Sequence, residues 1–149
     1  MDFPNALKSV AIFHQLIGEK ISDQPELLQT DGVVARELAS ELMMLVAKFK
    51  GAGDHLTKRM LISLEESAEW LEAHRNGDLV EAADAAADRL FVLLGDCIAT
   101  GLPIEKLFNA VSNSNMTKFA GVMGPDGKAI KSQAYLCPKA AIRQILSDK

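Results

Sequence analysis

Apolar residues in this chain recur every three or four positions, and no stretch alternates apolar and polar residues for long enough to predict a strand. Because an α-helix has about 3.6 residues per turn, this spacing gathers apolar side chains on one helical face. The pattern predicts an all-α fold, a bundle of four to five core helices followed by an irregular, basic C-terminal tail. The 149 residues suit one domain, which we expect to span residues 1–149.

Glycine, proline and aspartate residues mark where the predicted helices end and begin. Gly77 followed by Asp78, and Gly101 followed by Pro103, are typical stop and start signals. Asp78 and Glu81 also fit a capping box, with Asp78 as the N-cap. We therefore expect helices over about residues 5–20, 33–50, 54–76, 78–100 and 103–118, and a short helix within the tail over about 138–147.

The third predicted helix carries an unusual group of glutamates in the segment SLEESAEW, residues 63–70. Glu65 and Glu69 lie along one edge of the apolar stripe formed by residues such as Leu64 and Ala68, and Glu66 lies further round. Like charges one turn apart destabilise a helix by roughly 0.2–0.5 kcal/mol per pair and raise one another's pKa when partly buried. The group is either a solvated edge with basic partners or a site for a cation.

The fourth predicted helix repeats this arrangement with Asp84 and Asp88, which lie beside its predicted apolar face, formed by Leu79, Ala83, Ala86, Leu90, Leu93 and Leu94. Alanines allow a neighbouring helix to approach closely. Two adjacent antiparallel helices would then bring these aspartates towards the glutamates of the third helix. Converging carboxylates without histidine favour a hard cation, Mg²⁺ or Mn²⁺.

Charge is distributed unevenly along the chain. The segment 65–105 contains ten acidic and two basic residues, whereas the segment 118–143 contains five basic residues and one acidic residue. This distribution suits a metal together with a polyanion, although a solvated charged surface is the alternative. On the fifth predicted helix, Asn115 and Lys118 extend the apolar stripe of Ile104, Leu107, Phe108 and Val111, so they either face a ligand or simply reach solvent.

Four ordered segments resemble the all-α nucleoside triphosphate (NTP) pyrophosphohydrolases, which include MazG-like proteins, dimeric dUTPases and phosphoribosyl-ATP pyrophosphohydrolase. The first segment is FHQLIG, near the start. The second is the acidic motif, EESAE on one helix with DRLFVLLG on the next. The third and fourth are NSNMTKF and DGKAIKSQAYLCP. The MazG-like branch that hydrolyses dUTP is the most similar. The resemblance covers most of residues 10–143, except about 20–58.

The resemblance implies Mg²⁺-dependent cleavage of a nucleotide such as dUTP to the monophosphate and pyrophosphate. By position, it implies metal ligation by Glu66, Glu69 and Asp88, and general-base catalysis or metal binding by Glu65. The family's second motif has a glutamate where this chain has Ala85, and Asp84 is the natural substitute because it shares a helix face with Asp88. Substrate binding is expected from His14, Asn115, Lys118, Lys128 and Lys131.

Several alternatives remain open on the sequence. A register using Glu81 with Asp84 satisfies the acidic motif literally but loses the match to the following RLFVLLG. The substrate is an NTP or, alternatively, phosphoribosyl-ATP. Because Ala85 replaces the glutamate of the family motif, a third interpretation is a non-catalytic helical interaction module. His14 lies on the apolar face of the first helix, where a lone histidine is more often a core residue than a base-recognition residue.

The remaining expectations concern partners and location. The resemblance implies a homodimer or higher homo-oligomer, and Trp70, opposite the main stripe of its helix, is expected at a subunit interface. Cys97 and Cys137 form no metal or disulfide pattern, which predicts free thiols in a reducing compartment and hence a cytoplasmic protein. The chain lacks an apolar run of about 20 residues and a signal-peptide pattern, so we expect no membrane partner. We also expect no nucleic acid partner.

Overall fold

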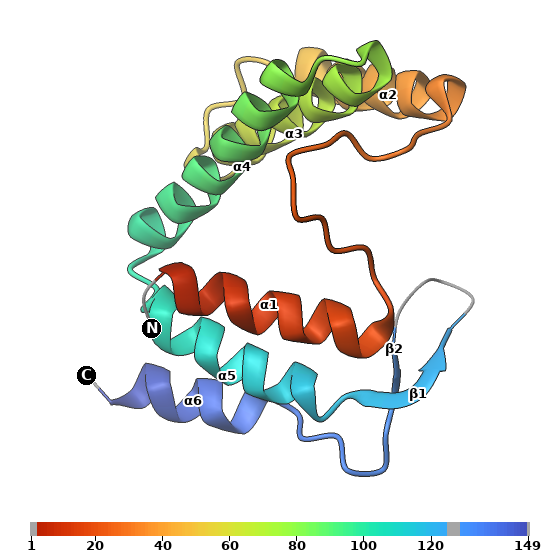
Figure 1. Cartoon of the computed structure of the whole chain (residues 1–149). Helices are drawn as coiled ribbons and strands as arrows, with labels where there is room; N and C mark the ends of the chain where they lie inside the picture. Colours follow the sequence, from red (N-terminus) through yellow and green to blue (C-terminus); the bar gives the residue numbers. More distant parts are fainter. Residues whose placement is uncertain (1–2, 125–128, 149) are drawn as a thin grey trace. The chain divides into compact units, whose positions relative to one another are not determined.

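The computed structural model describes residues 3–124 and 129–148 (Figure 1). It confirms the predicted all-α class. In chain order the elements within these residues are α1 (Phe3–Ile17), α2 (Gly32–Phe49), α3 (His55–Asn76), α4 (Leu79–Thr100), α5 (Ile104–Met116), β1 (Phe119–Met123), β2 (Ala129–Lys131) and α6 (Lys139–Ser147). Among the described residues, no helix is both long and apolar enough to span a membrane.

Aspartates begin three of these helices. The side chains of Asp31, Asp54 and Asp78 accept hydrogen bonds from backbone N–H groups in the first turns of α2, α3 and α4. Such a cap stabilises a helix by about 1 kcal/mol. Gly77 and Gly101 end α3 and α4 in the left-handed conformation, with φ of 73° and 67°, which glycine adopts without a steric penalty.

The predicted capping box at the start of α4 forms only in part. Asp78 accepts from the N–H groups of Val80 and Glu81, at 3.0 and 3.1 Å. Its own N–H, which the box assigns to the Glu81 carboxylate, instead donates to the Ala73 carbonyl at 3.0 Å. The tight turn through Gly77 places this amide over the end of α3, and Glu81 lines the cleft between α3 and α4.

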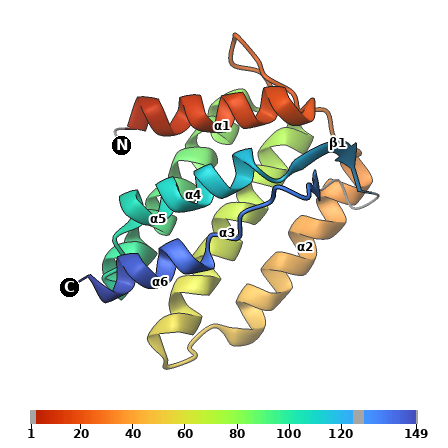
Figure 2. The same ribbon diagram turned by 90° about the horizontal axis from the view of Figure 1, so that it is seen from below.

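The chain divides into two compact units, and the first comprises residues 24–101. Within it, α3 packs against both α2 and α4, and Figure 2 shows α2 running beside α3. The predicted stripe of α3 is confirmed by Ala68, which is 2% exposed, and by Leu61 and Leu64, which share a groove with α2 residues. The buried residues of this unit are mostly alanines, so its helices approach closely.

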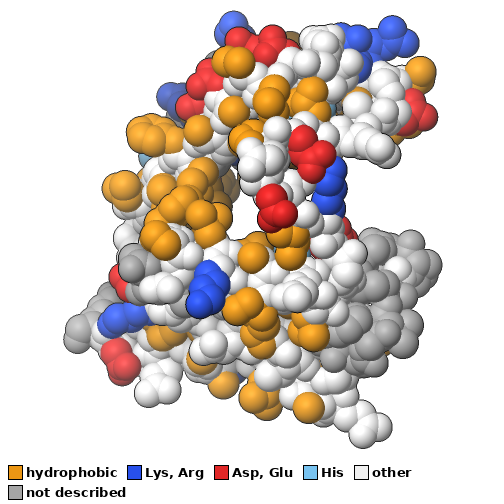
Figure 3. Space-filling model, viewed as in Figure 1, with side chains coloured by type: hydrophobic (Ala, Val, Ile, Leu, Met, Phe, Trp, Pro, Cys, Tyr) orange, Lys and Arg blue, Asp and Glu red, His pale blue; other side chains and the backbone are white. Residues whose placement is uncertain are grey.

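The predicted apolar face of α4 is not the face that this unit buries. Leu90, Leu93 and Leu94 are exposed, whereas Ala82 and Ala85 are buried. The small residues form the contact with α3 because they allow the two backbones to come close, and the leucines then lie off that contact. Figure 3 shows that hydrophobic side chains reach the surface at many points on the visible face.

The second unit comprises residues 1–23 and 102–149. In it α5 contacts both α1 and α6, and β1 pairs with β2 in an antiparallel ladder. The prediction of an irregular tail is wrong at this ladder, whose register pairs Phe119 with Lys131 and Met123 with Ala129. The strands are short and β1 contains an irregularity between the two pairs, which explains why no apolar alternation marks them in the sequence.

Candidate metal and nucleotide site

Glu66 lies at the centre of the acidic residues of α3 and α4. Its side chain is half-buried, and its Oε2 atom is buried with no hydrogen-bond partner. Leaving a buried charged oxygen without a partner is costly, so such an atom marks a position where a ligand or ion is expected. This observation is the one in the structure that points most directly to a bound cation.

The neighbours of Glu66 are the other acidic residues that the sequence singles out. Burial raises the pKa of Glu66 most, and the negative charges of nearby carboxylates raise that pKa further. These carboxylates, in decreasing order of effect, belong to Glu69, Asp88, Glu65 and Asp84. The packing of α3 and α4 therefore brings the other four carboxylates close enough to act on Glu66.

The five carboxylates fit a hard divalent cation in chemistry but do not form a finished cage. All their donor atoms are oxygens, and the orphaned Glu66 Oε2 lacks the partner that a cation would supply. In the part of the chain that the structure describes, no three acidic, histidine or cysteine side chains lie close enough to hold a metal. Binding would therefore require the carboxylates to turn inwards, and their role as ligands stays a prediction.

A cleft of about 320 Å³ lies beside this group, between the second half of α3 and the first half of α4. Its lining is mainly acidic and includes two of the predicted ligands, Glu69 and Asp84. Buried Ala85 also lines it, so a glutamate at this position, as in the family motif, would point into the same cleft. The complete lining is Glu69, Glu72, Ala73, Asn76, Asp78, Glu81, Asp84 and Ala85.

Glu65, the predicted general base, does not line this cleft but borders a different one. This cleft, of about 470 Å³, lies between α2 and α3 and has an apolar floor that includes Val46 and Leu61. Lys50 and Lys58 stand at it as well, so basic side chains occur on the side of Glu65 that faces α2. Glu65 therefore lies on the α2 side of the acidic group and outside the lining of the α3–α4 cleft.

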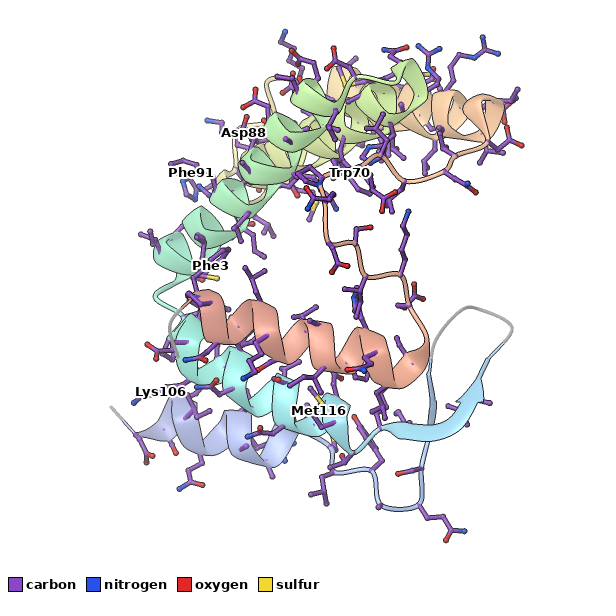
Figure 4. The ribbon with its side chains drawn as sticks, in the orientation of Figure 1. Phe3, Trp70, Asp88, Phe91, Lys106 and Met116 are labelled. Atoms are coloured by element: carbon purple, nitrogen blue, oxygen red, sulfur yellow. The ribbon has the colours of Figure 1, made fainter. Side chains whose placement is uncertain are left out.

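Another part of the α3–α4 contact is aromatic and basic. The guanidinium of Arg89 lies 4.6 Å from the centroid of the Trp70 ring, which also lies 4.4 Å from the ring of His74. Figure 4 labels Trp70 on α3 and Asp88, the residue before Arg89, on α4. A cation over an indole face is attractive. Trp70 therefore packs within the helix pair, and its predicted role at a subunit interface is not required to explain it.

The predicted substrate residues belong to the other unit. Asn115 lines a pocket of about 130 Å³ between α1 and α5, together with Ser9 and Ser112. Two aromatic rings, Phe13 and Phe108, complete the mixed apolar and polar surface. An amide and two hydroxyls beside aromatic rings are suited to a flat heterocycle or a sugar. Phe13 was missed by sequence reasoning, which singled out the next residue.

That next residue, His14, is half-buried and does not line this pocket. Its Nδ1 atom lies 3.4 Å from the carbonyl oxygen of Lys20, just after the end of α1. The contact gives His14 a local structural partner. The structure therefore supports the ordinary packing interpretation of this histidine more than a role in base recognition.

The predicted phosphate-binding lysines lie at the start of the tail. Lys118 is half-buried at the end of α5, and its carbonyl accepts from the Ser132 N–H at 2.8 Å. Lys131 is exposed on β2, and its Nζ lies 4.8 Å from the centroid of the Tyr135 ring. Lys128 lies outside the described residues.

Hydrogen bonds to the end of α5 and to Thr117, just after it, fix the segment that follows β2. Ser114, which is buried, donates from Oγ to the Leu136 carbonyl at 2.7 Å. Thr117 Oγ1 accepts from the Leu136 N–H at 3.0 Å, and Ser132 Oγ donates to the Thr117 carbonyl at 2.7 Å. These contacts hold the tail beside Lys118. The three hydroxyl residues occur in motifs that the sequence marks, but their partner is set by the fold.

One comparison with known proteins gives a match. A family model described as phosphoribosyl-ATP pyrophosphohydrolase matches residues 10–115. The matched segment is well over half of the chain and contains all five acidic residues and Asn115, whereas Lys118 and Lys131 lie beyond it. Neither a curated protein nor a solved structure gives a significant match.

Proposed function

Because this chain belongs to the phosphoribosyl-ATP pyrophosphohydrolase family, a family of all-α hydrolases that cleave phosphoanhydride bonds, we propose that it hydrolyses a nucleotide with the help of Mg²⁺. The preferred substrate is a (deoxy)nucleoside triphosphate such as dUTP, and the products are the monophosphate and pyrophosphate. The observation that carries the proposal is the buried, unpartnered Glu66 Oε2 atom among four further carboxylates.

The acidic residues of α3 and α4 would hold the metal. Glu66 and Glu69 supply oxygen donors from α3, and Asp84 and Asp88 supply them from α4. When bound, Mg²⁺ or Mn²⁺ would neutralise charge on the phosphates and acidify the attacking water. Asp84 takes the place of the family's glutamate at position 85, because it lines the same cleft as Ala85.

The other predicted residues would bind substrate and move the proton. Glu65, at the edge of the acidic group, would orient the water and accept its proton. Lys118 and Lys131 would bind the phosphates and stabilise the departing pyrophosphate, together with Lys128. Asn115 would hold the sugar or base in the pocket that it shares with Phe13.

Phosphoribosyl-ATP is the second candidate substrate, and the description of the matching family model favours it. Both candidates release pyrophosphate, so a single assay separates them. The purified chain is incubated with Mg²⁺ and one substrate at a time, and pyrophosphate is measured. The panel contains dUTP, the other common nucleoside triphosphates and phosphoribosyl-ATP.

The expected result is Mg²⁺-dependent release of pyrophosphate from dUTP at a higher kcat/KM than from the other substrates. A preference for phosphoribosyl-ATP would replace dUTP with the second candidate. Release from none of them would leave the third interpretation, a helical interaction module that keeps the fold.

A homodimer is part of the proposal. Three large apolar side chains of α4, Val80, Phe91 and Ile98, are 76%, 77% and 82% exposed. Their spacing of eleven and seven residues places them along one line of the helix. Large apolar side chains exposed along one line of a helix are typical of a surface that a partner covers. A second copy of this chain would cover it by a two-fold contact.

A further inference from the structure

Arg59 connects α3 to α4 away from the acidic group. Its Nε donates to the Asp96 carboxylate in an ion pair, and its Nη2 donates to the Val92 carbonyl at 3.0 Å. The Arg59 side chain is only 26% exposed. A guanidinium that bonds a side chain and the backbone of the same helix fixes both the distance and the register between the two helices.

Gly95 makes this contact possible. A Cβ atom at position 95 would lie 2.5 Å from Arg59 Nη2 and 3.5 Å from its Cζ. Real Cβ atoms do not approach other atoms so closely, so any side chain at this position would displace the guanidinium. The displaced group is the end of a flexible side chain, and the backbone of α4 has no need to move.

The acidic group lies between two points of attachment. On one side of it, Ala73 and Ala85 line the same cleft and the turn through Gly77 joins the two helices. On the other side, Arg59 lies seven residues, or about two turns, before Glu66 on the same face of α3. Asp96 lies eight residues beyond Asp88 on α4. The carboxylates repel one another between these two attachments. The Arg59 contact opposes the separation of α3 and α4 that this repulsion favours.

We propose that Arg59 is a positioning residue that holds α4 against α3, so that the like-charged carboxylates stay close enough to bind a divalent cation. This inference rests on the proposed function, because it assumes that the acidic group binds the metal. Arg59 acts through α4, and its loss lowers metal affinity. At saturating metal the carboxylates of both helices would be occupied without the help of Arg59, so kcat should return to the wild-type value.

The variant Gly95→Ala tests the proposal because it displaces the guanidinium without changing any charge. Binding of Mn²⁺ to the full chain, without nucleotide, is measured from the signal of free Mn²⁺ in electron paramagnetic resonance. We expect the dissociation constant to rise about tenfold, comparable to the loss of a side chain that orients a metal ligand. The Mg²⁺ concentration for half-maximal activity should rise equally, with kcat at saturating Mg²⁺ retained.

Two further variants show whether the effect passes through Arg59. Arg59→Ala should weaken Mn²⁺ binding to a similar extent, and adding Gly95→Ala to it should weaken binding no further. Arg36→Ala removes the same charge from α2 and should leave the affinity unchanged. Circular dichroism of each variant checks that the helices are retained.

The outcomes separate this inference from the proposed function. An unchanged Mn²⁺ affinity in Gly95→Ala, with a wild-type chain that binds Mn²⁺, overturns the positioning role alone. An equal further loss in the double variant overturns it too, because the effect then bypasses Arg59. A wild-type chain that binds no Mn²⁺ overturns both proposals.

Discussion

Glu66 of α3 and Asp88 of α4 carry like charges that act on each other across the contact between the two helices. Burial of Glu66 raises its pKa most, and the charges of Glu69 and then Asp88 raise it further. The folded chain thus keeps a repulsive group in the middle of a helix pair. Carboxylates perturbed in this way cluster at functional sites, which supports the proposed binding of a cation.

The raised pKa of Glu66 gives a pH dependence of stability. Its folded-state pKa lies above its ordinary value of 4.5, so the folded chain binds this proton more tightly than the unfolded chain does. The resulting stability is present below about pH 4.5 and is lost as the pH rises through the folded-state pKa. With metal chelated, Glu66→Gln should therefore be more stable than wild type near neutral pH.

Urea unfolding followed by circular dichroism, at about pH 4 and about pH 7, measures this difference. The advantage of Glu66→Gln should shrink at the lower pH, where the wild-type carboxyl is protonated. Glu41→Gln, at an exposed acid of α2, should show no such change. An equal effect of both variants at both pH values would mean that burial of Glu66 does not matter.

Removal of a proposed metal ligand should abolish activity while keeping the fold. Glu69→Gln preserves the shape of the side chain but removes a charged oxygen from the cleft. Loss of residues that merely orient ligands costs about 10–100-fold, so we expect kcat/KM to fall at least about a hundredfold. Pyrophosphate release is the measurement, and Glu41→Gln again serves as the control. Full activity of Glu69→Gln would remove this residue from the metal site.

A charge on the exposed line of α4 should prevent dimer formation. Ile98 is 82% exposed, so Ile98→Glu is tolerated in the free chain but would place an unpaired charge in an apolar interface. We expect a shift from dimer to monomer in size-exclusion chromatography with light scattering. Gln15→Glu adds the same charge at an exposed polar residue of α1 and should leave the dimer intact. A dimer that survives Ile98→Glu would have to use another surface.

The pocket between α1 and α5 should contribute to substrate recognition. Asn115→Ala removes the amide that lines it, and the loss of one such hydrogen bond corresponds to about a tenfold rise in KM. The expected kcat at saturating substrate is unchanged. Steady-state kinetics with dUTP checks this, and Asn113→Ala, at an exposed position on the same helix, is the matched control. If both variants raise KM equally, the pocket is not specific.

Release of the tail segment from α5 should be measurable directly. Thr117→Val removes the oxygen that accepts from the Leu136 N–H, and we expect faster amide hydrogen exchange over residues 132–136. KM should rise as well, because the same contacts hold the tail beside Lys118. Thr30→Val, at an exposed residue before α2, provides the control. Unchanged exchange at Leu136 would show that other contacts fix the segment.

The sequence by itself determined the helices, their ends and the acidic group. Apolar spacing and the signals at Gly77, Asp78 and Gly101 depend only on local backbone geometry, so they could be recognised without knowing the fold. The acidic residues of α3 and α4 could be paired because two consecutive helices joined by one short turn are forced to lie antiparallel.

Only the tertiary structure decided which faces meet and which partners the side chains take. The contact between α3 and α4 uses alanines rather than the leucine face, because close approach favours the smallest residues. The partnership of Arg59 with Asp96, and the choice of Phe13 rather than His14 for the pocket, depend on contacts between residues far apart in the chain. Such contacts leave no periodic trace in a single sequence, since each partner is specified by the packing of whole helices.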